Sequence, residues 1–475
     1  MTQTLEDAMN NVDISPSHEA KKARRNLQEY FIGPRDLTRH SKWPRALRMH
    51  GSVTPKILLR TILIGLWSAG ITAISQRVHE INIHPVVATV LGILVGFSLS
   101  LRSSTAYERY MEGRKVWSNL TGISATLARN IWCHAKERDG EDGKRDLLAK
   151  VSFLNLITAF ALALKHKVRF EPYTQYEDLF DLVNHLDTYA KYAGKPRTKT
   201  TRPNTWTKIK YLLRIAETNP RKELKRAKRP LGNLPSEILA YMNAYVQEIV
   251  DNGTFPLAAI QGKAVANIQT FDDILVTADR ILNTPLPIAY TIAISQITWI
   301  YVITLPLQLV KLMGWANIPV TMISAYIILG YAAIGNEIEN PFGTEVNDLP
   351  LELYCAQIAS DIAIISSRPP ARIEDYAFHP DNKPLYPIST SGPKYWPDAD
   401  IEDIGDALRT RALISKPAMW RRQSLISGKF PLVRDRSVGG STLNTQVSRP
   451  THGVPATADV RWADDGADGG GEGGD

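Results

Sequence analysis

Four long runs of apolar residues constrain this 475-residue chain more than any other feature. They lie at residues 57–75, 81–101, 285–310 and 314–335, and the last two contain no charged residue. Because an α-helix rises about 1.5 Å per residue, runs of about 19 to 26 residues are long enough to cross the hydrocarbon of a bilayer. We therefore predict an all-α membrane protein embedded in a lipid bilayer, with transmembrane helices at about 57–76, 85–101, 285–310 and 314–336.

Lysine and arginine are distributed unevenly around these runs. They are numerous before the first run and after the second, whereas the connections between runs one and two and between runs three and four carry only Arg77 and Lys311. Because positively charged loops stay on the cytosolic side, we expect both termini and the middle region 102–284 in the cytosol. The plasma membrane is the expected location, with an endomembrane as the alternative. The net charge of +8 has the same explanation, so no nucleic-acid partner is expected.

The remaining segments suggest how the chain is divided. The apolar stretch 151–164 reaches only about 21 Å as a helix, so it is predicted to be a buried helix of a large helical cytosolic region at 102–284. The lysine- and arginine-rich segment 195–228 is typical of a surface excursion. Residues 1–25 are polar, and residues 366–475 end in ADDGADGGGEGGD, so both ends are predicted to be largely disordered.

Few residues in these runs carry reactive or ionisable groups. Apart from tyrosines, only Arg60 and His84 are ionisable within the spans, which disfavours a charge-coupled transporter. The sequence has no glycine-rich phosphate loop, paired histidine or cysteine ligands, or nucleophile elbow, so an enzyme is not expected. Two cysteines, Cys133 and Cys355, exclude a disulfide framework. A pore and a membrane-anchored scaffold remain.

The second run carries two sets of residues at helical spacing. Gly92 and Gly96 are four apart, which allows a neighbouring backbone to approach one helical face. Thr89, Ile93 and Phe97 share a nearby face with the same spacing. These side chains either pack against lipid and neighbouring helices, or they form a narrow apolar constriction around an axis. The second interpretation requires a homo-oligomer, because four helices do not easily enclose a pore.

Four segments resemble the bestrophins, in particular their bacterial and fungal members. They are VLGILVGFSLSLRSSTAYERYMEGRKVW (90–117), DRILNTPLPIAYT (279–291), the fourth apolar run, and GNEIENPFGTEVNDLPLELYC (335–355). The resemblance implies a channel domain over about 26–365 and a pentamer in which five second spans line one axial pore. It also implies passive conduction, chiefly of chloride, with no cofactor required.

The resemblance assigns the hydrophobic neck of the family to Thr89, Ile93 and Phe97. Thr89 replaces the aliphatic residue that is usual there, which suggests a wetter outer neck. A second constriction in the cytosol is placed weakly near Ile260. We expect the hydroxyls of Thr89 and Ser98 and a basic cytosolic approach at Arg102 to reduce the cost of dehydrating an anion.

The stretch ENPFGTEVNDLPLE at 339–352 places carboxylates directly after the fourth run. Pro341 ends the helix, and Glu337 and Glu339 fall in its last turn, where the helix dipole disfavours negative charge. Either the basic juxtamembrane residues or a bound cation such as Ca²⁺ is expected to compensate them. Animal bestrophins clasp Ca²⁺ with consecutive acidic residues. This chain offers a weaker candidate clasp, formed by Glu337, Glu339, Asn340, Glu345 and Asp348.

Two other functions stay open from the sequence. An apolar neck does not fix the sign of the ion, so a sodium channel of the same fold is one alternative. The other alternative is a non-conducting membrane scaffold, in which Ile93 and Phe97 face lipid or neighbouring helices. The gating stimulus is not evident from the residues.

Overall fold

The computed structural model describes residues 44, 49, 51–81, 83–84, 86–192, 231–393, 395–396 and 399–414. No strand occurs among these residues, which agrees with the predicted all-α fold. The predicted disordered residues 1–25 and the excursion at 195–228 lie outside the described part. The described helices are α3 (Thr54–Arg77), α4 (Val86–His134), α5 (Glu141–Val168), α6 (Phe180–Val183), α7 (Tyr189–Tyr192), α10 (Leu234–Asp251), α11 (Ala258–Asn283), α12 (Ile288–Met313), the 3₁₀ turn η2 (Gly314–Ala316), α13 (Asn317–Ile338), α14 (Leu351–Ser366), α15 (Ile373–Tyr376) and α16 (Ile401–Ile414).

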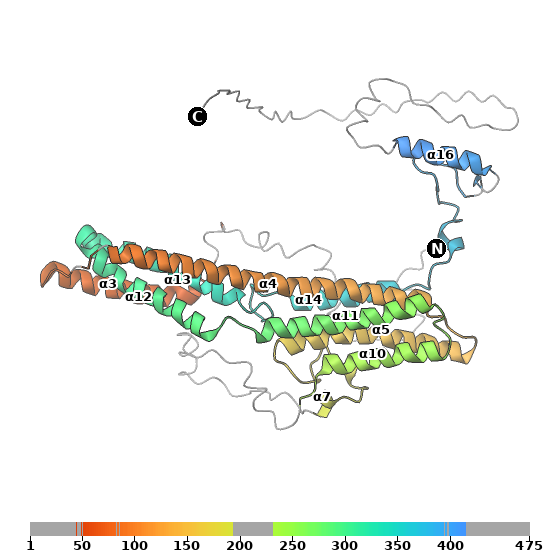
Figure 1. The fold of residues 1–475 in the computed structure, drawn as a ribbon, viewed down its shortest axis with the longest axis horizontal. Coiled ribbons are helices and arrows are strands. Elements are labelled where there is room, and N and C mark those ends of the chain that lie inside the picture. Colours follow the sequence, from red (N-terminus) through yellow and green to blue (C-terminus); the bar gives the residue numbers. More distant parts are fainter. Residues whose placement is uncertain are drawn as a thin grey trace, which may run out of the picture. The chain divides into compact units, whose positions relative to one another are not determined.

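Four of these helices lie where the sequence predicts transmembrane segments. Helices α3, α12 and α13 pack against one another, and α12 and α13 also pack against α4 (Figure 1). Large apolar side chains point outward from them, for example Leu66 and Ile327, which are 66% and 62% exposed. Such an apolar surface is stable when acyl chains surround it. These helices therefore form the membrane part of the protein.

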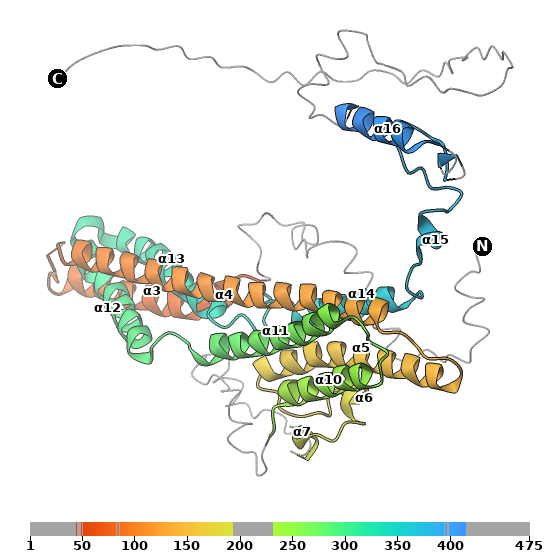
Figure 2. The ribbon, with the colours of Figure 1, turned by 45° about the vertical axis from the view of Figure 1, so that its right-hand side comes forward.

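Helix α4 continues far beyond its predicted end at Leu101. It runs unbroken for 49 residues to His134, because residues 102–134 contain no proline and keep a helical spacing of buried side chains. Trp117, Leu120 and Leu127 lie on that buried face. One helix thus connects the membrane part to a second bundle, as Figure 2 shows along its whole length.

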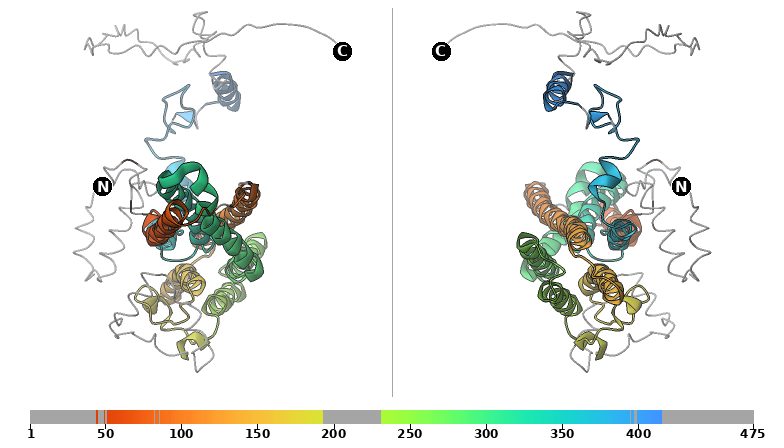
Figure 3. Two further views of the ribbon diagram at one scale, coloured as in Figure 1. Left: turned by 90° about the vertical axis from the view of Figure 1, so that its left-hand side faces the viewer. Right: turned by 90° about the vertical axis from the view of Figure 1, so that its right-hand side faces the viewer.

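The second bundle contains α5, α10, α11, α14 and the second half of α4 (Figures 2 and 3). These helices share one large apolar core. Phe160 of α5 is fully buried there, and its ring meets Phe271 of α11 edge to face at 5.0 Å between centroids. By length and composition α5 could itself cross a membrane. However, 56% of its most apolar window is buried inside the protein, against 17% for α4, so α5 is a core helix as predicted.

The chain divides into two compact units between Ala371 and Arg372. The second unit includes α15 and α16, so its part up to Ile414 is more regular than the sequence analysis predicted for 366–475. Residues 415–475 lie outside the described part. The candidate sites below belong to the first unit.

Candidate functional site

Thr89, Ile93 and Phe97 lie along one exposed face in the first turns of α4. The side chains of Ile93 and Phe97 are 67% and 65% exposed, and Thr89 is also exposed. The opposite face of the helix carries Val95 and Leu99, which are buried in a cluster with Ile294 of α12. We call the three residues the α4 stripe. Within one protomer the stripe contributes nothing to the apolar core.

Two kinds of surroundings can cover the exposed apolar side chains of the α4 stripe. Acyl chains would cover Ile93 and Phe97 as they cover the other outward residues of the membrane part. Alternatively, several copies of α4 gather around an axis and turn their stripes toward it. In the second arrangement the apolar side chains make a constriction that an ion crosses only after losing water.

The two glycines of the same segment differ in their surroundings. A Cβ atom at Gly92 would touch the Tyr301 side chain of α12 at 3.5 Å, which is ordinary van der Waals contact. A Cβ atom at Gly96 would meet nothing within 4 Å. Among the described residues of the protomer, no backbone lies against this pair. A close approach between copies stays a prediction.

Arg102, which the sequence placed at the cytosolic approach, is held inside the protomer. Arg102 is only 4% exposed and lies between α4 and α13. Its guanidinium donates to the Asn336 side chain and lies 3.4 Å from the Glu339 carboxylate. Arg102 lies five residues after Phe97, about 140° further round the helix, so its side chain points away from the stripe, whereas Ser98 is half-buried at the edge of the stripe. Arg102 neutralises an acidic helix end.

Lys56 and Arg102 compensate the carboxylates that end the fourth span. The Lys56 ammonium lies 2.9 Å from Glu337 and 2.5 Å from Glu345. Asn347 donates from its side chain to Glu337 and to the Gly51 carbonyl, both at 3.0 Å. Of the two compensations that the sequence left open, the described contacts match the basic juxtamembrane residues. The loop after α13 is thereby tied to the first turn of α3.

The five residues of the candidate clasp do not converge on one point. Glu337 and Glu345 meet at Lys56, Glu339 turns to Arg102, and Asn340 accepts from the Phe342 amide at 3.4 Å. Among the described residues, no three His, Cys, Asp or Glu side chains are grouped so that they could hold a metal ion. The residues present therefore do not fit the Ca²⁺ clasp that the resemblance suggests.

Asp348 lies inside the same loop. It accepts a hydrogen bond from the Glu345 amide at 2.6 Å and is 8% exposed. Burial raises its pKa to about 6, and the nearby charges of Glu345 and Glu337 act in the same direction. A Cβ atom at Gly343 would stand 2.4 Å from the Asp348 carboxylate, so this turn leaves no room for a larger residue at 343.

Residues 35–363 match the family model of the bacterial and fungal bestrophin proteins. The chain belongs to this family. A voltage-dependent anion channel-forming protein of Synechocystis sp. is 30% identical over 325 residues, which is 68% of this chain and 91% of the relative. A protein of the same name from Nostoc sp. is 30% identical over 330 residues, 68% of this chain and 92% of the relative.

A solved structure of a mutant bacterial bestrophin homologue from Klebsiella pneumoniae has the same fold, with a TM-score of 0.50. It is 23% identical, and the match covers 67% of this chain and all of the homologue. The four segments singled out in the sequence fall within or at the edges of the matched residues. The bestrophin resemblance is confirmed.

Arg109 holds two helix ends of this bestrophin together, a role that the sequence analysis missed. Its guanidinium donates to the carbonyls of Glu339 at 3.0 Å and Ile281 at 2.7 Å, and to that of Thr284. The last carbonyls of a helix have no partner within the helix, so a fork of N–H donors suits them. The signal available in the sequence was an arginine following a membrane helix, which usually indicates only an interface anchor.

Ile260 lies in the first turn of α11, where this bestrophin was predicted to have its second constriction. It is partly buried against the large core, and the adjacent Leu257 is 53% exposed. Whether these residues approach an axis depends on other copies of the chain. The second constriction therefore stays a prediction.

Proposed function

We propose that this bestrophin is a pentameric channel for chloride and similar small anions. One observation carries the proposal: in a member of a family whose named relatives form anion channels, the α4 stripe is apolar and exposed, and the opposite face of α4 is buried. Five copies arranged with their stripes inward would enclose an axial neck. Closed point-group symmetry of this kind is usual for soluble homo-oligomers.

Permeation in this proposal is downhill and needs no bond chemistry. An anion entering the neck gives up water to pass Phe97 and Ile93. The Thr89 and Ser98 hydroxyls donate hydrogen bonds that replace part of its hydration. Arg102 has no part in this path, because it is held inside the protomer. The anion preference is inferred from the named relatives.

Flux into liposomes tests the proposal. The wild-type protein should pass chloride down a gradient, and the double substitution I93A/F97A should raise the flux several-fold by widening and wetting the neck. L66A is the matched control, because Leu66 on α3 is 66% exposed, as the stripe residues are. Equal flux in all three proteins would contradict the proposal that Ile93 and Phe97 form the neck. Reversal potentials under a NaCl gradient would reveal a sodium channel, and no flux at all would favour the scaffold.

We propose further that Ca²⁺ is not needed for opening. The Lys56 ammonium occupies the space between Glu337 and Glu345, so the carboxylates of the loop are already neutralised by a cation of the chain. Chloride flux should then be the same with Ca²⁺ and with a chelator. In K56Q the two carboxylates lose their cation, and flux should fall while K144Q on the exposed end of α5 behaves as wild type. A flux that disappears with chelator in the wild type contradicts this proposal.

We propose that the second bundle lies in the cytosol beneath the plasma membrane. The lysine-rich flanks of the spans support this side. Cys133 is exposed in that bundle, whereas Cys355 is buried and its pKa is raised to about 12 by burial. A membrane-impermeant maleimide added to intact cells should leave the protein unlabelled, and permeabilisation should allow one thiol to react. Labelling of intact cells would reverse the orientation.

A further inference from the structure

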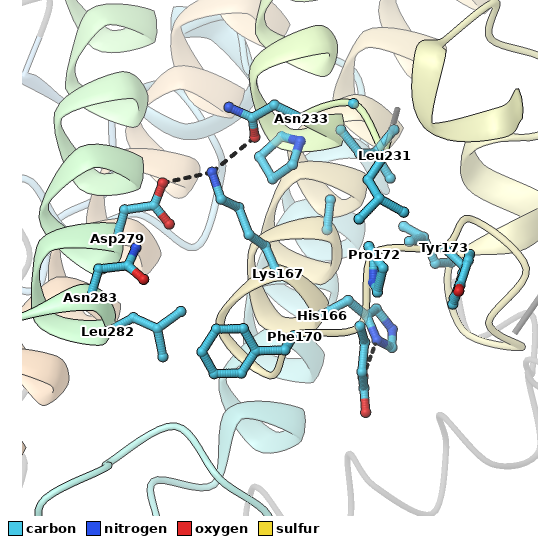
Figure 4. Close-up of a pocket in the computed structure, with 16 residues that line it drawn as sticks. His166, Lys167, Phe170, Pro172, Tyr173, Leu231, Asn233, Asp279, Leu282 and Asn283 are labelled. Atoms are coloured by element: carbon cyan, nitrogen blue, oxygen red, sulfur yellow. Dashed lines mark hydrogen bonds and ion pairs between the residues drawn. The ribbon is translucent and has the colours of Figure 1, made fainter. Parts of the chain in front are cut away.

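A cavity of about 340 Å³ lies in the second bundle, and no residue of the α4 stripe lines it. Its walls come from the C-terminal end of α5, the first turn of α10 and the last turns of α11 (Figure 4). Its volume falls in the range of small-molecule sites. The conduction path proposed above makes no use of it.

One side of the cavity is polar. Lys167 of α5 donates to the Asp279 carboxylate of α11 at 2.7 Å and to the Asn233 side chain at 3.0 Å (Figure 4). Lys167 and Asp279 keep 25% and 32% of their side-chain surface exposed. An ammonium has three N–H donors, and a carboxylate accepts at two oxygens. A donor and an acceptor therefore stand side by side at the cavity, each with capacity for another partner.

The rest of the lining is largely apolar but includes His166, Glu171 and Asn283, and one segment of it has an unusual backbone. Phe170 follows the end of α5 with φ of 61°. The Phe170 amide donates to the Lys167 carbonyl and the Glu171 amide donates to the His166 carbonyl, which is the pairing that closes a helix with a left-handed residue. Glycine is the usual residue there, since a side chain costs about 1 kcal/mol or more. The Phe170 ring lies beside Leu282. Because the backbone conformation disfavours a side chain here, the presence of phenylalanine points to a role of the ring itself.

His166 is part of the wall and is already occupied. Its two ring nitrogens lie 2.6 Å from Glu171 and 2.9 Å from Asp178, and its ring stacks on Tyr176. Burial lowers the pKa of His166, but these two hydrogen bonds outweigh burial and raise it. The histidine therefore stiffens the end of α5. Lys167 and Asp279 are left to meet a ligand.

We propose that this cavity binds a free α-amino acid with a large apolar side chain. The ligand carboxylate takes the remaining donor of Lys167, its ammonium meets Asp279, and its side chain packs against Phe170 and Leu282. A zwitterion leaves both charges of the ion pair compensated. An anionic ligand would be repelled by the Asp279 and Glu171 carboxylates and would bring no positive charge to them. A cationic ligand would be repelled by the Lys167 ammonium. The site bridges α5 and α11.

Calorimetric titration of the purified full-length protein with L-phenylalanine tests the proposal. Saturable binding is expected. N-acetyl-L-phenylalanine lacks the ammonium and L-phenylalanine amide lacks the carboxylate, so each should bind at least about tenfold more weakly, as loss of a charge-assisted hydrogen bond predicts. Glycine, which lacks the apolar side chain, should compete poorly. If N-acetyl-L-phenylalanine bound as well as L-phenylalanine, the proposal that the site recognises a zwitterion would be wrong.

Three substitutions locate the site. K167M and D279N should each weaken binding at least about tenfold, whereas K144M, which removes an exposed lysine at the other end of α5, should leave it unchanged. F170G is the sharpest variant, because glycine accepts the positive φ. It should keep or raise the melting temperature and still lose binding. Binding retained in all three variants, or no saturable binding to the wild type, refutes the proposal whatever the chloride flux.

Discussion

At Arg109 one guanidinium satisfies carbonyl oxygens from two separate helix ends. We predict that R109K lowers the free energy of unfolding by about 2 to 4 kcal/mol, because a lysine replaces only part of the fork and leaves half-buried carbonyls unpaired. Thermal melting of the detergent-solubilised protein measures the loss. K115R, on the solvent side of α4, is the control. An unchanged melting temperature in R109K would show that water replaces the lost donors.

Asp348 makes stability depend on pH. Its pKa is about 6 in the folded protein and near 4 when unfolded, so between these values the folded state binds more protons. Its contribution is therefore favourable in acid and is lost as pH rises through 6. D348N keeps an acceptor for the Glu345 amide and removes the charge, so the melting temperature of the variant should gain on the wild type from pH 4 to about pH 7. A constant difference over this range would contradict the assignment.

The contacts made by single residues were the hardest part of the site to predict from the sequence. Arg102 and Glu339 are 237 positions apart in the chain, and their pairing depends on how α13 packs against α4. Lys56 was one of ten basic residues before the first span, and nothing local distinguished it. The cavity around Lys167 was not anticipated either, because its walls come from three helices. Helical spacing did identify the exposed face with Ile93 and Phe97, since it depends on neighbours only four positions away.

At the scale of elements, the length of an apolar run was a sufficient guide to the spans. The described helices α3, α12 and α13 begin and end within about four residues of the predicted limits, because prolines, glycines and charges interrupt them there. The end of α4 was not found, because a helix leaving the membrane meets no such break. Its later half buries Trp117 and Leu120 against helices of the second bundle that only the tertiary fold brings near.

The core role of α5 gives a prediction for that helix. F160A should reduce the free energy of unfolding by about 3 to 5 kcal/mol, because it leaves a cavity against Phe271 in a fully buried site. Leu148 of the same helix is 68% exposed, so L148A should change it by less than about 0.5 kcal/mol. Thermal or denaturant unfolding compares them. If L148A proved the more damaging, α5 would instead present Leu148 to a partner.

At the scale of the whole molecule, the arrangement of copies decides the function. We predict that F97C, in a background with Cys133 and Cys355 replaced by serine and alanine, forms intersubunit disulfides on mild oxidation, because five stripes around a narrow axis bring position 97 of neighbouring subunits close. Non-reducing electrophoresis should show dimers. L66C in the same background should stay monomeric. Equal crosslinking of the two variants would remove the axial arrangement.

The unbroken course of α4 has a mechanical consequence. About 20 residues, or about 30 Å, of unbroken helix separate the stripe residue Phe97 from Trp117 in the second bundle. The direction in which Phe97 points around the helix axis is therefore fixed by how the second half of α4 packs in the second bundle. One residue inserted near Ser104 would rotate the membrane segment of α4 by about 100° relative to the segment packed in the second bundle. Seven inserted residues would nearly restore the original orientation. A rotation of the second half of α4 about its axis would therefore turn Phe97 in the same sense.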